Sequence, residues 1–527
     1  MSATTADHAH WRPRANPWAI AVVVTMSAFM ESIDTTIVNV SLPHIAGSMS
    51  ASYDDATWTL TSYLVANGIV LPISGWFGRL IGRKRYFMIC IAAFTASSFL
   101  CGVATSLPQI IIFRLMQGFF GGGLQPNQQS IILDTFEPSQ RGRAFSVVAI
   151  ATIFAPVIGP TLGGWITDNY TWRWVFLINV PVGIIAFLAV GALVEDPPWV
   201  KAESANRKGI DYIGVALIAL GIGCLQIMLD RGEDNDWFGD PTIRAFGILA
   251  AIGLIGAAVW LSIAKNPVVN IRVLRDRNFA LGSVMIFMIG AILYSSAVLI
   301  PQLAQEQLGY TAMLAGLILS PGAVLIIVLI PIITRLLPHI PTKYFIGFGF
   351  FSLGCALAYA HSLTPDVDYN TLALMRAAQT FGLAFLFVPN STIAYSTLPR
   401  SANADASSLY VMFRNISGSI GISLSTALET ERTQIRRSYL APHLTPLEQP
   451  YVTLKAQIAN TLMAHGTAAS AAPSVADGLI NMTLQKQAAV LAYTDVFAIT
   501  SIAAFCVVPI TLLFSSSRAT GRPRAEH

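Results

Sequence analysis

Apolar runs of about twenty residues follow one another along almost the whole chain, for example at 85–104, 242–263 and 279–302. A helix needs about 20 apolar residues to cross the hydrocarbon core of a bilayer, because each residue adds about 1.5 Å. The charged fraction is 11%, well below the roughly 25% of soluble domains. These features predict an all-α polytopic membrane protein and argue against a soluble domain with one anchor.

The apolar runs predict fourteen membrane-spanning helices joined mostly by short polar loops. An even number of spans places both chain ends on the same side of the membrane. The spans are expected at 18–42, 56–78, 85–104, 108–132, 140–165, 173–194, 210–229, 242–263, 279–302, 312–334, 343–361, 370–391, 403–427 and 493–514.

The distribution of Lys and Arg predicts which side holds the two ends. With a cytoplasmic N-terminus, the cytoplasmic segments carry 21 Lys and Arg, whereas the six short outer loops carry two, Arg173 and Arg231. Basic short loops stay in the cytoplasm, and a long outer segment such as 428–492 counts little. We therefore expect a multi-pass protein of the cell (inner) membrane with both termini cytoplasmic. The net charge of +4 then reflects orientation and not a nucleic-acid surface.

An internal repeat divides the chain into two halves. The sequence RLMQGFFGGGLQPN begins at Arg114, and RAAQTFGLAFLFVPN begins 262 residues later at Arg376. Chance similarity between apolar helices is the alternative, which the rarity of Arg and Gln in membrane spans disfavours. The repeat relates spans 1–6 to spans 9–14 and leaves spans 7 and 8 as an insertion.

Two six-helix bundles joined by an inserted helix pair predict a transporter whose pathway lies between the halves. The expected organisation is an N-terminal segment at 1–17, a bundle at 18–194, a linker with the two inserted helices at 195–278, a second bundle at 279–514 that includes the outer segment 428–492, and a tail at 515–527.

Two acids, Glu31 and Asp34, lie within the first apolar run, where charge is costly. Their spacing puts them on one face of a helix. With Pro43 as the outer end of the first span, Asp34 lies about 13 Å below it. With Pro108 as the outer end of the fourth span, Arg114 lies about 9 Å below the same surface. The two charges are thus expected at similar depth.

A buried acid beside an Arg stays ionised, whereas one without such a neighbour tends toward neutrality, so this arrangement suits exchange of a proton for a cationic substrate. We therefore assign proton coupling to Asp34, Glu31 and Arg114. An ion pair that merely holds helices together is the alternative. Further polar residues within the spans are candidates for substrate binding or for the pathway: Gln117, Asn39, Arg376, Gln379 and Arg414.

The sequence APVIGPTLGG at 155–164 gives the fifth span a flat strip of small residues, formed by Gly159, Gly163 and Gly164. Such a strip allows close approach of a second helix. Pro160 removes a backbone donor and favours a bend. The combination suits a helix at a moving interface, although ordinary small-residue packing explains it as well.

The sequence GWFGRLIGRKRY at 75–86 joins the second and third spans. Gly75, Gly78 and Gly82 allow a tight turn. Arg79 and Arg83 are placed to meet helix ends, lipid phosphates or acids of other spans. A latch that gates the pathway and a simple cytoplasmic anchor explain these residues equally well.

The sequence lacks the motifs of several other functional classes. The sequence has no Walker A motif, no HExxH and no GxSxG, so neither ATP-driven transport nor these hydrolytic chemistries are expected. The five cysteines lie in apolar runs without CxxC or Cys/His spacing, so we expect no metal site and no cofactor. The outer segment 428–492 is either a docking element or a solvated loop.

These motifs resemble those of the major facilitator superfamily, in particular its fourteen-helix drug:proton antiporters. IDTTIVNVSLP resembles the first-span signature, RLMQGFFGGG the fourth-span motif whose Arg serves proton coupling, and APVIGPTLGG the antiporter motif of exporters. WRWVFLINVPVG and LQIMLDRGEDNDWF resemble stretches of one multidrug-exporter subgroup. The chain departs from the family pattern at Arg79, where an acid is usual, and at Glu31, where an uncharged residue is common.

The resemblance implies proton-driven efflux of lipophilic drugs by alternating access. It also implies a membrane-fusion adaptor and an outer-membrane channel as partners, in a bacterium with two membranes. Export of one endogenous compound, such as a siderophore or a peptide, is an alternative within the same class. Import, or a membrane-embedded receptor or enzyme, are more remote alternatives.

Overall fold

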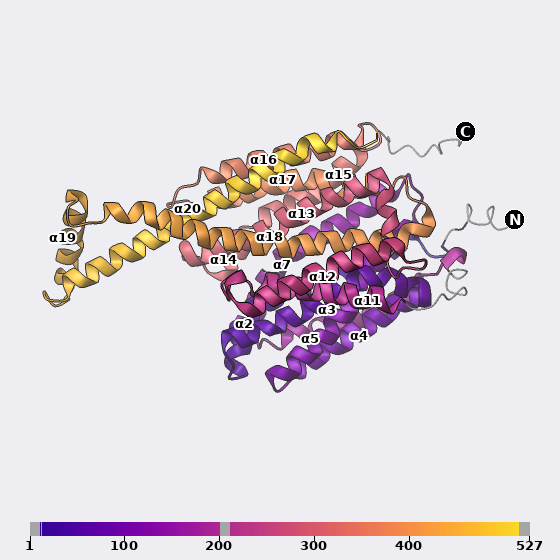
Figure 1. Cartoon of the computed structure of the whole chain (residues 1–527), viewed down its shortest axis with the longest axis horizontal. Helices are drawn as coiled ribbons and strands as arrows, with labels where there is room; N and C mark the ends of the chain where they lie inside the picture. Colours follow the sequence, from indigo (N-terminus) through magenta and orange to yellow (C-terminus); the bar gives the residue numbers. More distant parts are fainter. Residues whose placement is uncertain (1–10, 12, 201–210, 516–527) are drawn as a thin grey trace.

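The computed structural model describes residues 11, 13–200 and 211–515, and within these residues every regular element is helical. Parts of the expected N-terminal segment 1–17, of the linker 195–278 and of the tail 515–527 lie outside the described residues. The start of α2 and the end of α20 lie at one end of the helical bundle, and α19 projects at the opposite end (Figure 1).

The first half forms six helical segments at the expected spans. Asn16 caps the first of them by accepting a hydrogen bond from the Trp18 amide, and Pro17 occupies the first helical turn. Gly82 turns the chain sharply between the second and third helices with φ +96°. The elements are α2 (Pro17–Ser48), α3 (Tyr53–Ile81), α4 (Arg83–Val103), α5 (Leu107–Gly121) with α6 (Leu124–Thr135), α7 (Arg141–Asn169), and α8 (Trp174–Leu177) with α9 (Asn179–Leu193).

The inserted pair consists of α11 (Tyr212–Arg231) and α12 (Pro241–Ile263). The two helices pack closely because glycines face each other, and a Cβ on Gly253 would lie 2.3 Å from the Gly221 nitrogen. Asp240 caps α12 and accepts hydrogen bonds from two amides, which lower the pKa of its carboxyl. Helix α11 also contacts α3 of the first half and α18 of the second.

The second half repeats the arrangement with longer helices at its end. Its elements are α13 (Arg277–Gln302), which continues into a π-helical turn (Leu303–Gln307), α14 (Ala312–Leu317) with α15 (Ser320–Leu336), α16 (Thr342–His361), α17 (Tyr369–Ala394), α18 (Asn403–Leu440), α19 (Gln449–Ala464) and α20 (Ala472–Thr511).

In the described residues, twelve helical segments are long and apolar enough to cross a membrane. The other two expected spans coincide with α5 and α6, which are separated at Gly122–Gly123, and with α18. Helix α18 carries many polar residues, and it lies among α3, α13 and α20 with much of that polar surface buried. A polar helix is tolerated where other helices shield it from lipid. The structure is therefore consistent with fourteen spans.

One expectation about a helix end is wrong. Pro43 does not end the first span, because α2 continues through it to Ser48. Helices make up most of the outer segment 428–492: α18 and α20 both extend beyond the bundle, and α19 crosses their outer ends (Figure 1). One missing amide donor at a proline is too little to end a long helix that packs along its length.

Ionic contacts hold this outer extension together. Arg436 of α18 donates two hydrogen bonds to Asp495 of α20, at 2.8 and 2.5 Å. Lys455 and Tyr451 of α19 donate to Asp477 of α20, at 2.6 and 2.7 Å. These hydrogen bonds lower the pKa of Asp477, with that from Lys455 contributing most. The extension is thus a folded helical element.

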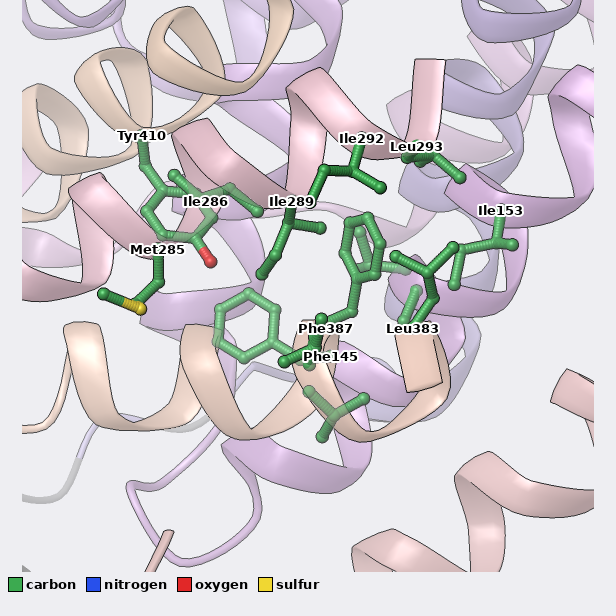
Figure 2. Close-up of a cluster of buried hydrophobic side chains, with 14 of the residues drawn as sticks. Phe145, Ile153, Met285, Ile286, Ile289, Ile292, Leu293, Leu383, Phe387 and Tyr410 are labelled. Atoms are coloured by element: carbon green, nitrogen blue, oxygen red, sulfur yellow. The ribbon is translucent and has the colours of Figure 1, made fainter. Parts of the chain in front are cut away.

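An apolar cluster joins the two halves within the bundle. Phe145 and Ile153 of α7 lie against Ile289 of α13 and against Leu383 and Phe387 of α17 (Figure 2). All five side chains are buried. Since lipid tails are as apolar as these residues, it is shape complementarity and not exclusion from water that holds such helices together.

The glycine strip of α7 packs against α2, the helix that carries the two acids. A Cβ on Gly159 would lie 1.9 Å from Thr36 Oγ1, and one on Gly163 would lie 2.8 Å from the carbonyl oxygen of Ile37. Gly164 is less crowded, because the nearest atom to a Cβ there lies 3.8 Å away on Val40, also of α2. Helix α7 runs without interruption through Pro160. Two of the three glycines therefore allow a backbone approach that no other residue permits.

Gly163→Ala is expected to lower the thermal unfolding midpoint of the purified protein, because its methyl group meets the backbone of α2. Overpacking of this kind costs about 1–3 kcal/mol. Gly164→Ala is the matched control, since it makes the same change one residue away, where the added methyl group meets its nearest neighbour at an ordinary contact distance of 3.8 Å, and it gains helix propensity. Equal midpoints for the two variants would show that contact between α7 and α2 does not limit stability.

Candidate functional site

Helix α2 carries Glu31 and Asp34 into the interior of the first half. Asp34 is 0% exposed and Glu31 is 2% exposed. Although the two residues are one turn apart, each carboxylate has its own set of partners. Neither carboxylate faces the surrounding lipid, which is the arrangement required if these groups are to bind and release protons.

Both oxygens of Asp34 are held by the first half. Arg114 Nη1 of α5 donates to Asp34 Oδ2 at 2.5 Å. The other oxygen accepts from Gln117 Nε2 at 2.9 Å and from Asn179 Nδ2 at 2.7 Å. Three helices thus converge on one carboxylate, and the expected meeting of Asp34 and Arg114 is found.

Arg114 is fixed by further contacts. Its Nε donates to the carbonyl oxygen of Thr59 at 3.1 Å, and its Nη1 donates to Gln117 Oε1 at 2.8 Å. The guanidinium carbon lies 4.1 Å from the centroid of the Tyr63 ring and 5.7 Å from that of Phe176. Aromatic faces stabilise a cation that has left water. The ion pair is therefore enclosed and held in one geometry.

Glu31 lies in a separate network of neutral donors. Tyr63 Oη and Asn67 Nδ2 of α3 each donate to Oε1 at 3.1 Å. Gln125 Nε2 of α6 donates to Oε2. Tyr63 links the two networks, because its hydroxyl contacts Glu31 while its ring lies against Arg114.

Gln125 also connects Glu31 to the second half. Its Oε1 accepts a hydrogen bond from Arg414 Nη2 of α18. A small cavity of about 10 Å³ adjoins this contact, lined by side chains of α2, α6, α7 and α18 that include Ser32, Gln125 and Arg414. Sites for drug-sized molecules are usually about 300–1,000 Å³. A larger molecule therefore requires the halves to move apart.

The remaining candidates from the sequence fall into two groups. Arg376 and Gln379 of α17 are buried in the second half, where Arg376 Nη1 donates to Ser296 Oγ at 2.7 Å and to Gln379 Oε1 at 3.3 Å. Asn39 is exposed on α2, and within the described residues it joins neither acid network. Of the five candidates for substrate binding or for the pathway, four are thus interior groups, and Asn39 is not.

The residues of the 75–86 loop meet the second half. Arg79 forms an ion pair with Asp405, in the first turn of α18. A Cβ on Gly75 would lie 2.7 Å from the carbonyl oxygen of Ala404, so the glycine lets the two helices touch. An acid in the first turn of a helix also complements its dipole. The absence of an acid at position 79 therefore does not remove an ionic contact between the halves.

Arg83 forms a second ionic contact beside the first. It pairs with Asp134 at the end of α6, and both side chains are buried. Asp134 Oδ1 accepts from Asn403 Nδ2 at the start of α18, at 2.9 Å. Gly78 leaves room for Asn127, whose Oδ1 would lie 3.1 Å from a Cβ there. This network again ends on the second half.

Several residues of the site escaped the sequence reasoning. Tyr63, Asn67, Gln125 and Asn179 bind the two acids, and Asp134 and Asp405 bind the loop arginines. The available signal was polarity within apolar spans, together with the spacing of Tyr63 and Asn67, which puts them on one helix face. In the described part of the chain, no group of three His, Cys, Asp or Glu side chains is arranged to hold a metal ion.

Comparison with known proteins identifies the family to which this architecture belongs. The family model described as Major Facilitator Superfamily matches residues 24–422. The "Multidrug export protein EmrB" of Escherichia coli (strain K12) is 33% identical over 479 residues, covering 91% of each chain. The "Fatty acid resistance protein FarB" of Neisseria gonorrhoeae is 32% identical over 508 residues, covering 96% of this chain and 97% of the relative.

A solved structure supports the fold. The proton:xylose symporter XylE superimposes with a TM-score of 0.58 at 14% identity, covering 95% of this chain and 97% of that one. The likeness to EmrB agrees with the exporter subgroup indicated by the sequence motifs. By its matched residues and by its relatives, the chain belongs to the Major Facilitator Superfamily, a family of membrane transporters and not of enzymes.

Proposed function

We propose that the protein is a proton-driven multidrug exporter, which moves lipophilic compounds, cationic ones included, out of the cell by drug:proton antiport. The observation that carries this proposal is the pair of buried acids on α2: Asp34 in an ion pair with Arg114, and Glu31 joined through Gln125 to the second half. The name of the relative EmrB, multidrug export protein, supports the cargo.

Asp34 is the primary proton site in this mechanism. When ionised, it balances the charge of Arg114 in a region of low dielectric, where an unpaired charge is costly. A proton or a cationic drug nearby changes that balance, so the carboxylate favours one of them at a time. Protonation from outside releases the drug, and loss of the proton to the cytoplasm resets the site.

Glu31 couples protonation to the contact between the halves. Its carboxylate accepts from Gln125 Nε2, and the same amide accepts from Arg414 Nη2. A protonated Glu31 has lost the charge that orients the amide, which weakens the bond to Arg414. The halves then separate more easily beside the small cavity. In this mechanism, alternating access results from protonation of Glu31, which weakens the contact between the two halves.

Charge and shape support an orientation and a set of partners. The basic loops indicate that the end with Arg79, the start of α2 and the end of α20 is cytoplasmic. The extension formed by α18, α19 and α20 then projects outward (Figure 1). It is a folded surface suited to a membrane-fusion adaptor and, through it, to an outer-membrane channel. The two bundles are taken at 18–194 and 279–514, with the inserted pair in the linker at 195–278.

Asp34→Asn is expected to reduce uphill efflux of a cationic dye to the level of membranes that lack the protein. The amide still accepts from Gln117 and Asn179, but it binds no proton and leaves Arg114 without a counter-charge. The measurement is dye uptake into inverted membrane vesicles with an imposed proton gradient, with and without an uncoupler. Dye exchange without a gradient is expected to persist, because it needs no net proton movement.

Asp495→Asn is the matched control, since it makes the same chemical change and breaks an ion pair, with Arg436, outside the site. It is expected to leave uptake unchanged. Removal of one partner from a buried pair costs about 3–5 kcal/mol, so the amount of folded protein is measured for both variants. Wild-type uptake by folded Asp34→Asn would refute the coupling assignment.

The ionic contact of Arg79 with Asp405 is expected to act as a latch between the halves. Arg79→Asp places two acids together and should lower dye uptake, and the double exchange Arg79→Asp with Asp405→Arg should restore it. A change of 1–2 kcal/mol alters the population of the latched arrangement roughly 5- to 30-fold. Arg85→Asp, at an exposed basic residue of the same loop, is the control. Failure of the double exchange to recover any uptake would favour the simple anchor.

A further inference from the structure

The buried Arg and Gln of the first half have counterparts in the second. Arg114 and Gln117 of α5 correspond to Arg376 and Gln379 of α17, 262 residues later. The same offset relates Asp34 of α2 to Ser296 of α13. The Arg and the Gln are thus repeated, whereas the carboxylate between them is not.

In the first half, the Arg and the Gln hold the two oxygens of one carboxylate. Arg114 Nη1 donates to Asp34 Oδ2 at 2.5 Å, and Gln117 Nε2 donates to Asp34 Oδ1 at 2.9 Å. Arg114 Nη1 also donates to Gln117 Oε1 at 2.8 Å, which fixes the two donors relative to each other. The pair is a preorganised fork for a carboxylate.

In the second half, the same fork is present without its acid. Arg376 Nη1 donates to Gln379 Oε1 at 3.3 Å and to Ser296 Oγ at 2.7 Å. Among the described residues, Arg376 Nε and Gln379 Nε2 have no hydrogen-bond partner, and Arg376 forms no ion pair. The unpartnered Gln379 Nε2 corresponds to the atom that holds Asp34 Oδ1 in the first half.

Burial makes these unpaired donors costly. Arg376 is 2% exposed, Gln379 0% and Ser296 4%. A guanidinium does not lose its proton in a protein, so it cannot escape the cost by becoming neutral. A buried charge without a partner is strongly destabilising, and each unmade hydrogen bond adds to that cost. An anion supplied from outside the chain would remove both costs.

We propose that Arg376, Gln379 and Ser296 bind the carboxylate head group of a lipophilic acid, with the acid replacing the side chain that Asp34 provides in the first half. Donors from two side chains suit the two oxygens of a carboxylate better than a monatomic ion. The acid is cargo only if the proposed export function holds, whereas its binding does not depend on that function.

The surroundings suit an alkyl tail. Leu293 lies one turn from Ser296 on α13, and Leu383 lies one turn from Gln379 on α17, so each leucine shares a helix face with a donor. Both leucines belong to the apolar cluster between the halves (Figure 2). Separation of the halves would therefore expose an apolar wall next to the donors.

The test is binding of radiolabelled decanoate to the full-length protein in nanodiscs, with empty nanodiscs subtracted. Decanol and decyltrimethylammonium are the probes of equal chain length without the carboxylate. The wild-type protein is expected to bind decanoate saturably, and decanol more weakly. Arg376→Gln should weaken decanoate binding about tenfold or more, which is the loss of one charged hydrogen bond. Arg376→Lys should retain part of the affinity.

Ser296→Asp is the decisive variant, because it restores the internal acid of the first half. Its carboxylate is expected to occupy the fork, to abolish decanoate binding and to raise the thermal unfolding midpoint without ligand. This variant also covers the case in which Arg376→Gln does not fold. Asp34→Asn should still bind decanoate, so a failure of the proposed proton coupling would be seen separately.

Three results would overturn the proposal. Decanoate binding that is equal in the wild type, Ser296→Asp and Arg376→Gln would place the acid elsewhere. No saturable binding to the wild type would mean that water alone satisfies the donors. Chloride binding that is lost in Ser296→Asp, without any decanoate binding, would identify a halide site.

Discussion

The ion pair between Asp34 and Arg114 governs the rest of the first half. Two full charges out of water are tolerated only when geometry and additional hydrogen bonds offset their desolvation. Here Gln117 and Asn179 complete the carboxylate, while Thr59 and an aromatic ring complete the guanidinium. Four helices must therefore keep their register for one pair of charges. The close approach of α7 to α2 at Gly163 keeps that register firm.

The halves communicate through a different set of contacts. Gln125 joins Glu31 to Arg414 in the interior, and Arg79 joins Asp405 at the end with the basic loops. Both contacts terminate on α18, which also packs against α13 and α20. A polar helix in the middle of an apolar bundle is thus the common recipient of an acid network and of an ionic contact. That helix therefore links the two halves, in addition to the apolar cluster.

The spans and the buried acids could be predicted from the sequence, whereas the contacts between the two halves could not. Run length and polarity marked the spans, and the rarity of charge in lipid singled out Glu31, Asp34 and Arg114. Gln125 was missed because its partner Arg414 lies 289 residues away, and no local pattern reports how two bundles face each other. Hydropathy marks only what crosses the membrane, so it left the outer segment 428–492 open between a docking element and a solvated loop. Pro43 misled because it was taken as a helix end, whereas α2 continues through it.

Helix α18 is a single unbroken rod from the basic loops to the outer extension. Its 38 residues make it about 57 Å long. Asp405 lies in its first turn and Arg414 lies in the interior. The helix ends beyond the bundle, next to α20 (Figure 1). A rigid lever of this length turns a tilt of ten degrees at the inner end into a displacement of about 10 Å at the tip. A partner bound at the outer end of α18 would therefore be moved during each protonation cycle.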